Sequence, residues 1–244
     1  MYLLIDAGNT RIKWLLMDSV YDNSALVSYG DLEEFKAYVA RLDVYGIKVV
    51  LAAVNQTDTL INVLHKVGFK QIEIASSRAE QLGVINSYAQ PERMGVDRWL
   101  AMIAAYSAVN KNTASGVIVV DAGSALTVDV VDIAGKHLGG YIVPGLMMAQ
   151  RALFSNTERV IPYESSSPGS ELTTPFNILG NNTLQCVEYG VINQLVALVQ
   201  SVVGRYPGYE VVFTGGDGEL IANFFTPTKI DKNLVLKGLW QVRN

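Results

Sequence analysis

The chain has 244 residues, enough for one large domain or two small ones, and half of them are hydrophobic, which suffices for sizeable cores. A net charge of −4 with no basic run argues against a nucleic-acid binder, and no apolar stretch reaches the roughly 18 residues of a membrane span. The N-terminus does not resemble a signal peptide, and the single cysteine and two histidines argue against a disulfide framework or a zinc site. We therefore expect a soluble cytoplasmic protein that binds neither nucleic acid nor membrane.

The first predicted element is a β-hairpin, in which apolar runs at residues 2–5 and 12–17 flank the sequence DAGNT. Its turn offers a carboxylate, a glycine that lets a ligand approach the backbone, an amide, a hydroxyl and, shortly after, a lysine. Such groups suit phosphate oxygens and a metal ion, although no P-loop motif follows and a plain hairpin turn explains the same sequence. The candidate residues are Asp6, Gly8, Asn9, Thr10 and Lys13.

The rest of the first half alternates strands with helices, an order typical of an α/β half-domain. Asp31 with Glu34 predicts a capping box at the start of a helix, and a continuous apolar run at residues 47–54 is typical of a strand buried on both faces. The predicted elements are strands at residues 25–29, 47–54 and 70–75 and helices at residues 31–44 and 57–67.

An irregular connection at residues 76–94 leads into a predicted helix at residues 95–110, which begins with the sequence GVDR. Asp97 lies in the first turn of this helix, where the macrodipole favours an ionised carboxylate that can accept a proton from a substrate hydroxyl. Arg98 can hold a carboxylate or a phosphate through two N–H groups. Ordinary helix-start chemistry with a surface arginine explains the same residues.

The sequence at residues 117–132 repeats the first hairpin. Its letters VIVVDAGSALTVDVVD contain a matching apolar run, the same Asp-Ala-Gly and a second alternating run, with Asp121 in the place of Asp6. Repetition of such a unit about half a chain later indicates a duplicated fold, although DAG after a β run also recurs by chance. We predict two half-domains, residues 1–112 and 113–244, whose turns face each other across a cleft.

The second half continues with further strands and helices and a glycine-rich turn, GGDG at residues 215–218, which exposes backbone N–H groups to a nucleotide or is simply a flexible connection. Residues 155–177 are polar and typical of a surface excursion. We interpret His65 and His137 as incidental and Cys186 as a packing residue. The predicted elements are strands at residues 137–143 and 209–214 and helices at residues 146–154, 183–203 and 219–225.

Taken together, these motifs resemble those of the type III pantothenate kinases, in the same order and over essentially the whole chain. Each motif is weak alone, but the ordered set is specific. One departure is Ser124, where many members of the family have threonine; the hydroxyl is kept. The motifs are D-x-G-N-T-x-x-K at residues 6–13, G-x-D-R at 95–98, D-x-G-[ST]-A at 121–125, G-x-N-T at 180–183 and a TGG turn at 214–216.

The resemblance implies two ribonuclease-H-like halves of the actin, Hsp70 and sugar-kinase superfamily, with a nucleotide between them. It implies ATP-dependent phosphorylation of pantothenate to 4′-phosphopantothenate, the first step towards coenzyme A, with Mg²⁺ or another divalent cation. A homodimer and a monovalent cation, K⁺ or NH₄⁺, are further family features. Because the family includes proteins first described as Bvg accessory factors, a regulatory protein and another small-molecule kinase of the superfamily stay open as alternatives.

By position, the resemblance makes Asp97 the catalytic base, Asp121 a ligand of the monovalent cation, and Asp6 a ligand of the divalent ion that accompanies ATP. The residues implied around ATP are Asp6, Gly8, Asn9, Thr10, Lys13 and Ser124. Those implied around pantothenate are Tyr88, Gly95, Val96, Asp97, Arg98 and Thr183, the last across the dimer.

The sequence supports a separate cation at Asp121. Two carboxylates near one polyphosphate repel it and each other unless cations intervene. Val128 stands where the first copy has Lys13, and residues 124–129 contain no lysine or arginine. A monovalent cation is the simplest substitute, and a divalent ion bound through water is the alternative.

The long helix at residues 183–203 carries a stripe of apolar residues. The stripe serves either packing within the chain or a dimer interface, and the resemblance favours the dimer. Its members are Leu184, Val187, Val191, Leu195 and Leu198.

Overall fold

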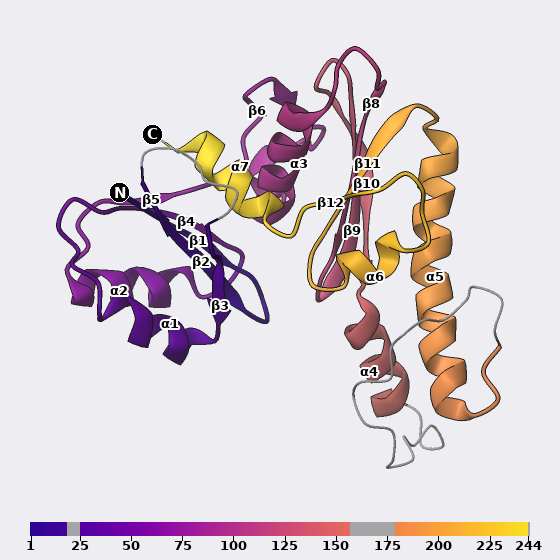
Figure 1. The fold of residues 1–244 in the computed structure, drawn as a ribbon, viewed down its shortest axis with the longest axis horizontal. Coiled ribbons are helices and arrows are strands. Elements are labelled where there is room, and N and C mark those ends of the chain that lie inside the picture. The colour runs from indigo at the N-terminus through magenta and orange to yellow at the C-terminus, as the bar shows by residue number, and fades with distance from the viewer. Residues whose placement is uncertain (19–24, 157–178, 244) are drawn as a thin grey trace. The chain divides into compact units, whose positions relative to one another are not determined.

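The structure of the chain is a computed structural model that describes residues 1–18, 25–156 and 179–243 (Figure 1). Its contacts divide the chain into two compact units. The predicted boundary near residue 112 between two half-domains stays a prediction. By its contacts, the C-terminal segment belongs to the first unit. The first unit comprises Met1–Val109, Val131–Leu138 and Asn233–Asn244, and the second comprises Asn110–Val130 and Gly139–Lys232.

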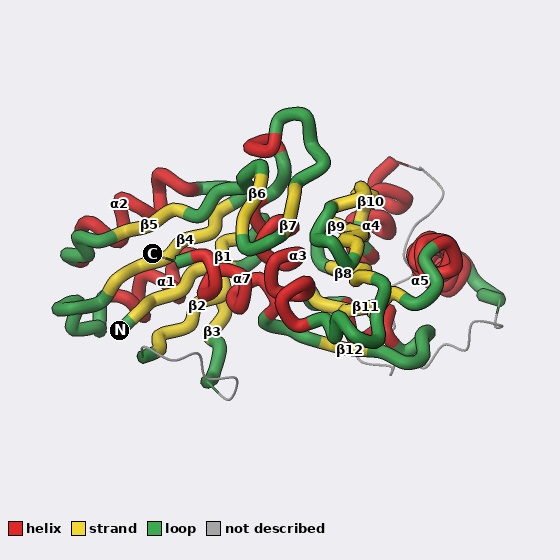
Figure 2. The backbone as a smooth tube through the Cα atoms, turned by 90° about the horizontal axis from the view of Figure 1, so that it is seen from above, coloured by secondary structure: helices red, strands yellow, loops and turns green. Residues whose placement is uncertain are grey.

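The first unit contains one five-stranded mixed sheet, whose strands are β1 (Tyr2–Ala7), β2 (Ile12–Met17), β3 (Ser28–Gly30), β4 (Lys48–Ala53) and β5 (Ile72–Ile74). Their order across the sheet is β3-β2-β1-β4-β5, which can be followed in Figure 2. β1 and β2 form the predicted antiparallel hairpin, while β4 runs parallel to β1, and β5 runs parallel to β4. Both faces of β1 and β4 are buried, which accounts for their continuous apolar runs.

Two helices cover one face of this sheet, α1 (Leu32–Val39) and α2 (Thr57–Val67), which lie side by side in Figure 1. The capping box is confirmed: the Asp31 carboxylate accepts the backbone N–H of Glu34 at 2.9 Å, and the Glu34 carboxylate accepts that of Asp31 at 2.9 Å. α1 ends at Val39, earlier than the predicted residue 44, and the chain turns after its C-cap, Ala40. Leu42 and Val44 follow this turn and pack against the core under the helices.

The opposite face of the sheet carries α3 (Val96–Ala108) and α7 (Leu234–Val242), which pack against each other. The helix α7 was not predicted from the sequence. This helix packs on β1 and β4, and the ring of Tyr2 meets that of Trp240 edge-on, with centroids 5.4 Å apart. Side chains alternate along a strand, so Asp6 points to the same face of the sheet as Tyr2, the face on which α3 and α7 lie.

The second unit repeats the strand order of the first, as β10-β9-β8-β11-β12. β11 is parallel to β8, and β12 is parallel to β11, as β4 and β5 are in the first sheet. The duplication predicted from the repeated turn is therefore confirmed at the level of sheet topology. The strands are β8 (Gly116–Ala122), β9 (Ala125–Asp132), β10 (His137–Pro144), β11 (Tyr209–Thr214) and β12 (Lys229–Ile230).

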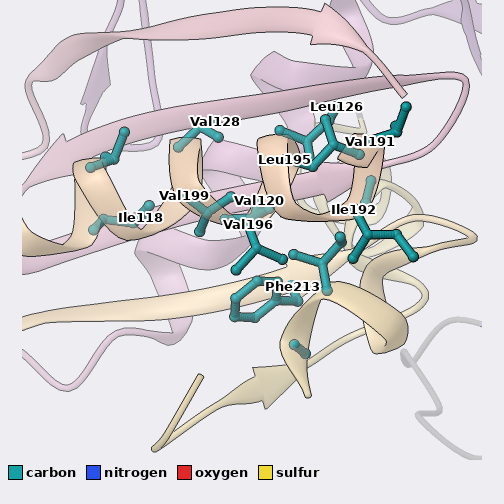
Figure 3. Close-up of a cluster of buried hydrophobic side chains, with 14 of the residues drawn as sticks. Ile118, Val120, Leu126, Val128, Val191, Ile192, Leu195, Val196, Val199 and Phe213 are labelled. Atoms are coloured by element: carbon teal, nitrogen blue, oxygen red, sulfur yellow. The ribbon is translucent and has the colours of Figure 1, made fainter. Parts of the chain in front are cut away.

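The helices of the second unit are α4 (Leu146–Asn156), α5 (Thr183–Arg205) and α6 (Gly218–Ala222). Figure 3 shows the core between the sheet and α5, where β-branched residues and leucines from both sides interlock around Phe213. The first two residues of the predicted excursion at 155–177 end α4, and its remaining residues lie outside the described part of the chain. The labelled core residues are Ile118, Val120, Leu126, Val128, Val191, Ile192, Leu195, Val196, Val199 and Phe213.

By length and composition, α5 resembles a membrane span, since it has 23 residues and an 18-residue window of mean hydropathy 1.4. This differs from the prediction that no apolar stretch of the sequence is long enough to span a membrane. One such helix is weak evidence for a membrane segment, because the core helix of a soluble protein has the same character, and α5 has six buried residues facing the core of its unit.

Candidate active site

The turn of the first hairpin is closed by a hydrogen bond from the backbone N–H of Gly8 to the carbonyl oxygen of Arg11, at 3.1 Å. Asn9 and Thr10 are exposed at its tip. A Cβ atom at Gly8 would lie 3.5 Å from that same carbonyl oxygen, an ordinary contact. The fold therefore does not require glycine here, which leaves the close approach of a ligand as the predicted reason for it.

Asp6 and Lys13 are directly opposite each other in the β1–β2 register, and both are half-buried. Opposed residues of antiparallel strands point to the same face of the sheet. The hairpin thus presents a carboxylate and an ammonium group together, on the face that carries α3. This combination suits a phosphate chain with a bound cation.

In the second unit, Asp121 stands near the end of β8, and the glycine-rich turn after β11 packs against it. Gly215 has φ +88°, and a Cβ atom there would collide with the Asp121 carboxylate and the backbone of Ala122. The backbone N–H of Asp217 donates to the carbonyl oxygen of Ala122 at 2.8 Å. Glycine at 215 is therefore needed for the turn to lie this close, whereas Gly216 has open space around it.

Burial raises the pKa of the half-buried Asp217 carboxyl above its ordinary value. This group lies in the GGDG turn that the sequence analysis offered as a nucleotide contact.

The second hairpin has a shorter turn than the first, residues 123–124 instead of 8–11. The backbone N–H of Gly145 donates to the carbonyl oxygen of Ser124 at 3.0 Å, which fixes this turn against the start of α4. Because of the shorter turn, Lys13 has two possible counterparts. Val128 follows Asp121 by the same number of residues as Lys13 follows Asp6, whereas Leu126 is the second residue of β9, as Lys13 is of β2. Both are fully buried and apolar, so neither repeats the lysine of the first hairpin.

The predicted substrate motif forms the start of α3. The carboxylate of Asp97 accepts the backbone N–H of Arg98 at 2.8 Å. A Cβ atom at residue 95 would lie 2.6 Å from the same carboxylate oxygen, so Gly95 leaves the space that Asp97 occupies. Val96 is buried beneath the first turn of the helix. The GVDR sequence thus has a steric reason for its glycine that sequence alone did not show.

Arg98 is only 6 % exposed, which corrects the alternative of a surface arginine. Its guanidinium donates to the hydroxyl oxygen of Tyr88 at 2.8 Å, and its central carbon lies 5.7 Å from the centre of that ring. The structure therefore brings together two residues that the sequence analysis placed at the substrate. Buried arginines in proteins are almost always paired, and guanidinium groups are suited to carboxylate recognition.

The profile of the type III pantothenate kinase family matches residues 2–205 of the chain. The chain belongs to this family. A type III pantothenate kinase of Dichelobacter nodosus is 32% identical over 98% of this chain and 96% of its own. One of Marinobacter nauticus is 34% identical over 99% of this chain and 98% of its own.

Two solved structures have the same fold. A protein described as a Baf family transcriptional activator from Campylobacter jejuni matches 97% of this chain and 94% of its own, with TM-score 0.64 and 23% identity. The activator of 2-hydroxyisocaproyl-CoA dehydratase from Clostridium difficile, solved with bound ADPNP, matches 98% and 92%, with TM-score 0.51 and 14% identity. These likenesses concern the fold alone and agree with the two sheets of like strand order described above.

Thr183, which the family resemblance implies at pantothenate, begins α5 beside an open pocket of about 590 Å³. Asn182 caps this helix by accepting the N–H of Gln185 at 3.0 Å. Cys186 lines the same pocket and is exposed, with its sulfur 3.3 Å from the carbonyl oxygen of Gly180. The interpretation of Cys186 as a packing residue is therefore wrong.

The predicted site residues divide between the two units. Asp6, Lys13, Tyr88, Asp97 and Arg98 belong to the first, with the contacts described above. Asp121, Ser124 and Thr183 belong to the second. His137, which was interpreted as incidental from the sequence, contacts Tyr88 and is considered further below.

Proposed function

We propose that this protein transfers the γ-phosphoryl group of ATP to pantothenate in the cytoplasm and so forms 4′-phosphopantothenate for coenzyme A synthesis. Membership of the type III pantothenate kinase family over residues 2–205 carries the proposal. The first unit supports it with a hairpin in which Asp6 and Lys13 are opposite each other, and with a helix that begins with a carboxylate next to a buried arginine.

Phosphoryl transfer depends on positioning and on neutralising charge more than on covalent chemistry. In the proposed mechanism, the Asp97 carboxylate accepts the proton of the pantothenate hydroxyl as that oxygen attacks the γ-phosphorus. Arg98 holds the pantothenate carboxylate, a role suited to a guanidinium already fixed by Tyr88. Lys13 contributes positive charge to the phosphates of ATP.

A divalent ion fits this donor set only if it arrives with ATP. Within residues 1–18, 25–156 and 179–243, no three His, Cys, Asp or Glu side chains gather as a site made of protein ligands alone requires. Mg²⁺ is commonly held by one or two carboxylates together with substrate phosphates. Asp6 would supply that carboxylate, and the ion would neutralise charge on the phosphates.

We expect ATP turnover to require pantothenate and a divalent ion. The test is ADP release by the purified chain with pantothenate, with glucose or with no acceptor. ADP release with pantothenate, but neither with glucose nor without an acceptor, supports the proposal. Equal turnover without an acceptor would indicate an ATPase, and preference for glucose would indicate a sugar kinase of the same superfamily.

We further propose that Asp121 binds a monovalent cation, K⁺ or NH₄⁺. The lysine that neighbours Asp6 has no charged counterpart at Leu126 or Val128, and the family resemblance includes such an ion. Carboxylate and backbone oxygens are suitable ligands for a hard cation.

Activity is accordingly expected in potassium or ammonium chloride and to be weak in sodium chloride, at constant ionic strength. Asp121→Asn should remove this dependence. Equal activity of the wild type in all three salts would reject the cation, and a variant that keeps the full dependence would place the cation elsewhere.

We also propose a homodimer. In the second unit, large apolar side chains are exposed on β10 and α4, among them Ile142 at 59% and Met147 at 56%. The stripe on α5 is a weaker candidate, because Val191 and Leu195 are buried in the core of their own unit. Sedimentation at assay concentration measures the state, and an active monomer would exclude a site completed by a partner's Thr183.

A further inference from the structure

The loop that carries Tyr88 is fastened to the turn before β10 by backbone contacts. It includes two short strands, β6 (Glu80–Gln81) and β7 (Val84–Ile85). The N–H of Ile85 donates to the carbonyl oxygen of Gly135 at 2.8 Å. A Cβ atom at Gly135, which has φ +88°, would collide with the carbonyl oxygen of Gly83. The two segments are thus held at backbone contact, and a glycine is required where they meet.

His137 follows this turn as the first residue of β10 and is 0% exposed. Its Nδ1 lies 2.9 Å from the hydroxyl oxygen of Ser87, and its ring stacks on that of Tyr88, with centroids 6.4 Å apart and an interplanar angle of 30°. Burying an imidazole is unfavourable unless its polar atoms are hydrogen-bonded. The bond to Ser87 therefore ties a buried side chain to an exposed loop residue.

Tyr88 connects this histidine to the buried arginine. Its ring contacts His137, and its hydroxyl accepts a hydrogen bond from Arg98. Its own backbone N–H donates to the side-chain oxygen of Asn86 at 2.9 Å, which sets the direction of the residue in the loop. A half-buried tyrosine on a loop is otherwise free to change rotamer, and ordering it at the moment of binding would cost affinity.

We propose that His137 is a positioning residue, which holds Tyr88 and through it the Arg98 guanidinium in place before the acceptor substrate binds. This inference rests on the proposed function, in which these two residues contact pantothenate. It assigns a function to a histidine that lies outside every motif in the sequence. A side chain that acts only on acceptor binding should affect KM for pantothenate and leave the chemical step unchanged.

His137→Gln removes the ring and its Nδ1, and we expect KM for pantothenate to rise about tenfold, as for loss of one buried hydrogen bond. The kcat and the KM for ATP should stay within about twofold of wild type, since neither depends on this contact. His137→Asn keeps a polar atom near the place of Nδ1 and should recover most of the affinity. Ser87→Ala should also raise KM for pantothenate. The double variant should have a KM close to that of His137→Gln, because both substitutions remove the same hydrogen bond.

His65→Gln is the control for the loss of a histidine. His65 is the other histidine of the chain, and it is exposed, with its Nδ1 3.1 Å from the carbonyl oxygen of Phe69, four residues later. This variant should leave both KM values unchanged. If His137→Gln instead lowers thermal stability and kcat while the KM for pantothenate is unaltered, the residue is only part of the core and the inference is overturned.

Hydrogen–deuterium exchange of the loop, without any acceptor, separates this inference from the proposed function. Amides around residues 85–88 should exchange faster in His137→Gln than in wild type or His65→Gln. Unchanged exchange would overturn the positioning function even in an active pantothenate kinase. Faster exchange in an enzyme that does not phosphorylate pantothenate would retain the positioning of Tyr88 and reject pantothenate as the acceptor.

Discussion

Replacing Asp97 by asparagine is expected to lower kcat by about 10²–10⁴, the usual contribution of a general base. Asparagine keeps the shape of the side chain and an oxygen that can accept the N–H of Arg98, a bond of 2.8 Å in the wild type. It cannot accept the proton of the substrate hydroxyl. The affinity for ATP should change little, so single-turnover kinetics should locate the loss in the chemical step.

Asp58→Asn is the matched control for this substitution. Asp58 is the second residue of α2, as Asp97 is of α3, so both changes remove a carboxylate from the first turn of a helix in the same unit. The favourable interaction with the helix dipole is lost in both. Activity should be normal in Asp58→Asn. An Asp97→Asn variant within threefold of wild type would show that another group accepts the proton.

Gly238→Ala should destabilise the first unit by about 1–3 kcal/mol, the usual cost of overpacking. Gly238 lies in α7, and a Cβ atom there would approach the carbonyl carbon of Leu100 to 2.6 Å and collide with its oxygen. The obstacle is the backbone of α3, which cannot rotate away as a side chain would. α7 must therefore move from α3, the helix that carries Asp97 and Arg98. Urea unfolding measures the change in free energy.

Gly190→Ala in α5 gives the opposite expectation. No atom lies within 4 Å of the position that its Cβ would take. Alanine should then stabilise the helix by about 1 kcal/mol through its higher helix propensity. If Gly238→Ala were as stable as Gly190→Ala, the close packing of α7 on α3 would be wrong.

The elements predictable from the sequence were those set by local signals. The capping box at Asp31 and the glycine after α2, which has φ +112° at the C-cap, mark helix ends through groups only a few residues apart. The two hairpins followed from apolar runs on either side of the same turn. Their repetition also predicted the duplicated sheets, because one turn sequence in two copies implies one supersecondary unit in two copies.

Features that depend on distant residues were missed. α7 has apolar residues at helical spacing after Asn233, a signal that was available, but its place beside α3 depends on tertiary packing. His137 gave no local signal, since its partner Ser87 lies 50 positions earlier in the chain. The close contact that a Cβ atom at residue 95 would make with the Asp97 carboxylate follows from the rotamer of Asp97, which a sequence does not record.

The proposed phosphorylation of pantothenate is tested most directly by following the phosphoryl group itself. The purified chain is incubated with ATP labelled at its γ-phosphate, Mg²⁺, potassium chloride and pantothenate, and the products are identified by mass spectrometry. We predict labelled 4′-phosphopantothenate in amounts equal to the ADP formed, and none from Asp97→Asn in the same time. ADP formed at an equal rate without pantothenate, with the label in free phosphate and pantothenate unchanged, would contradict the proposed function.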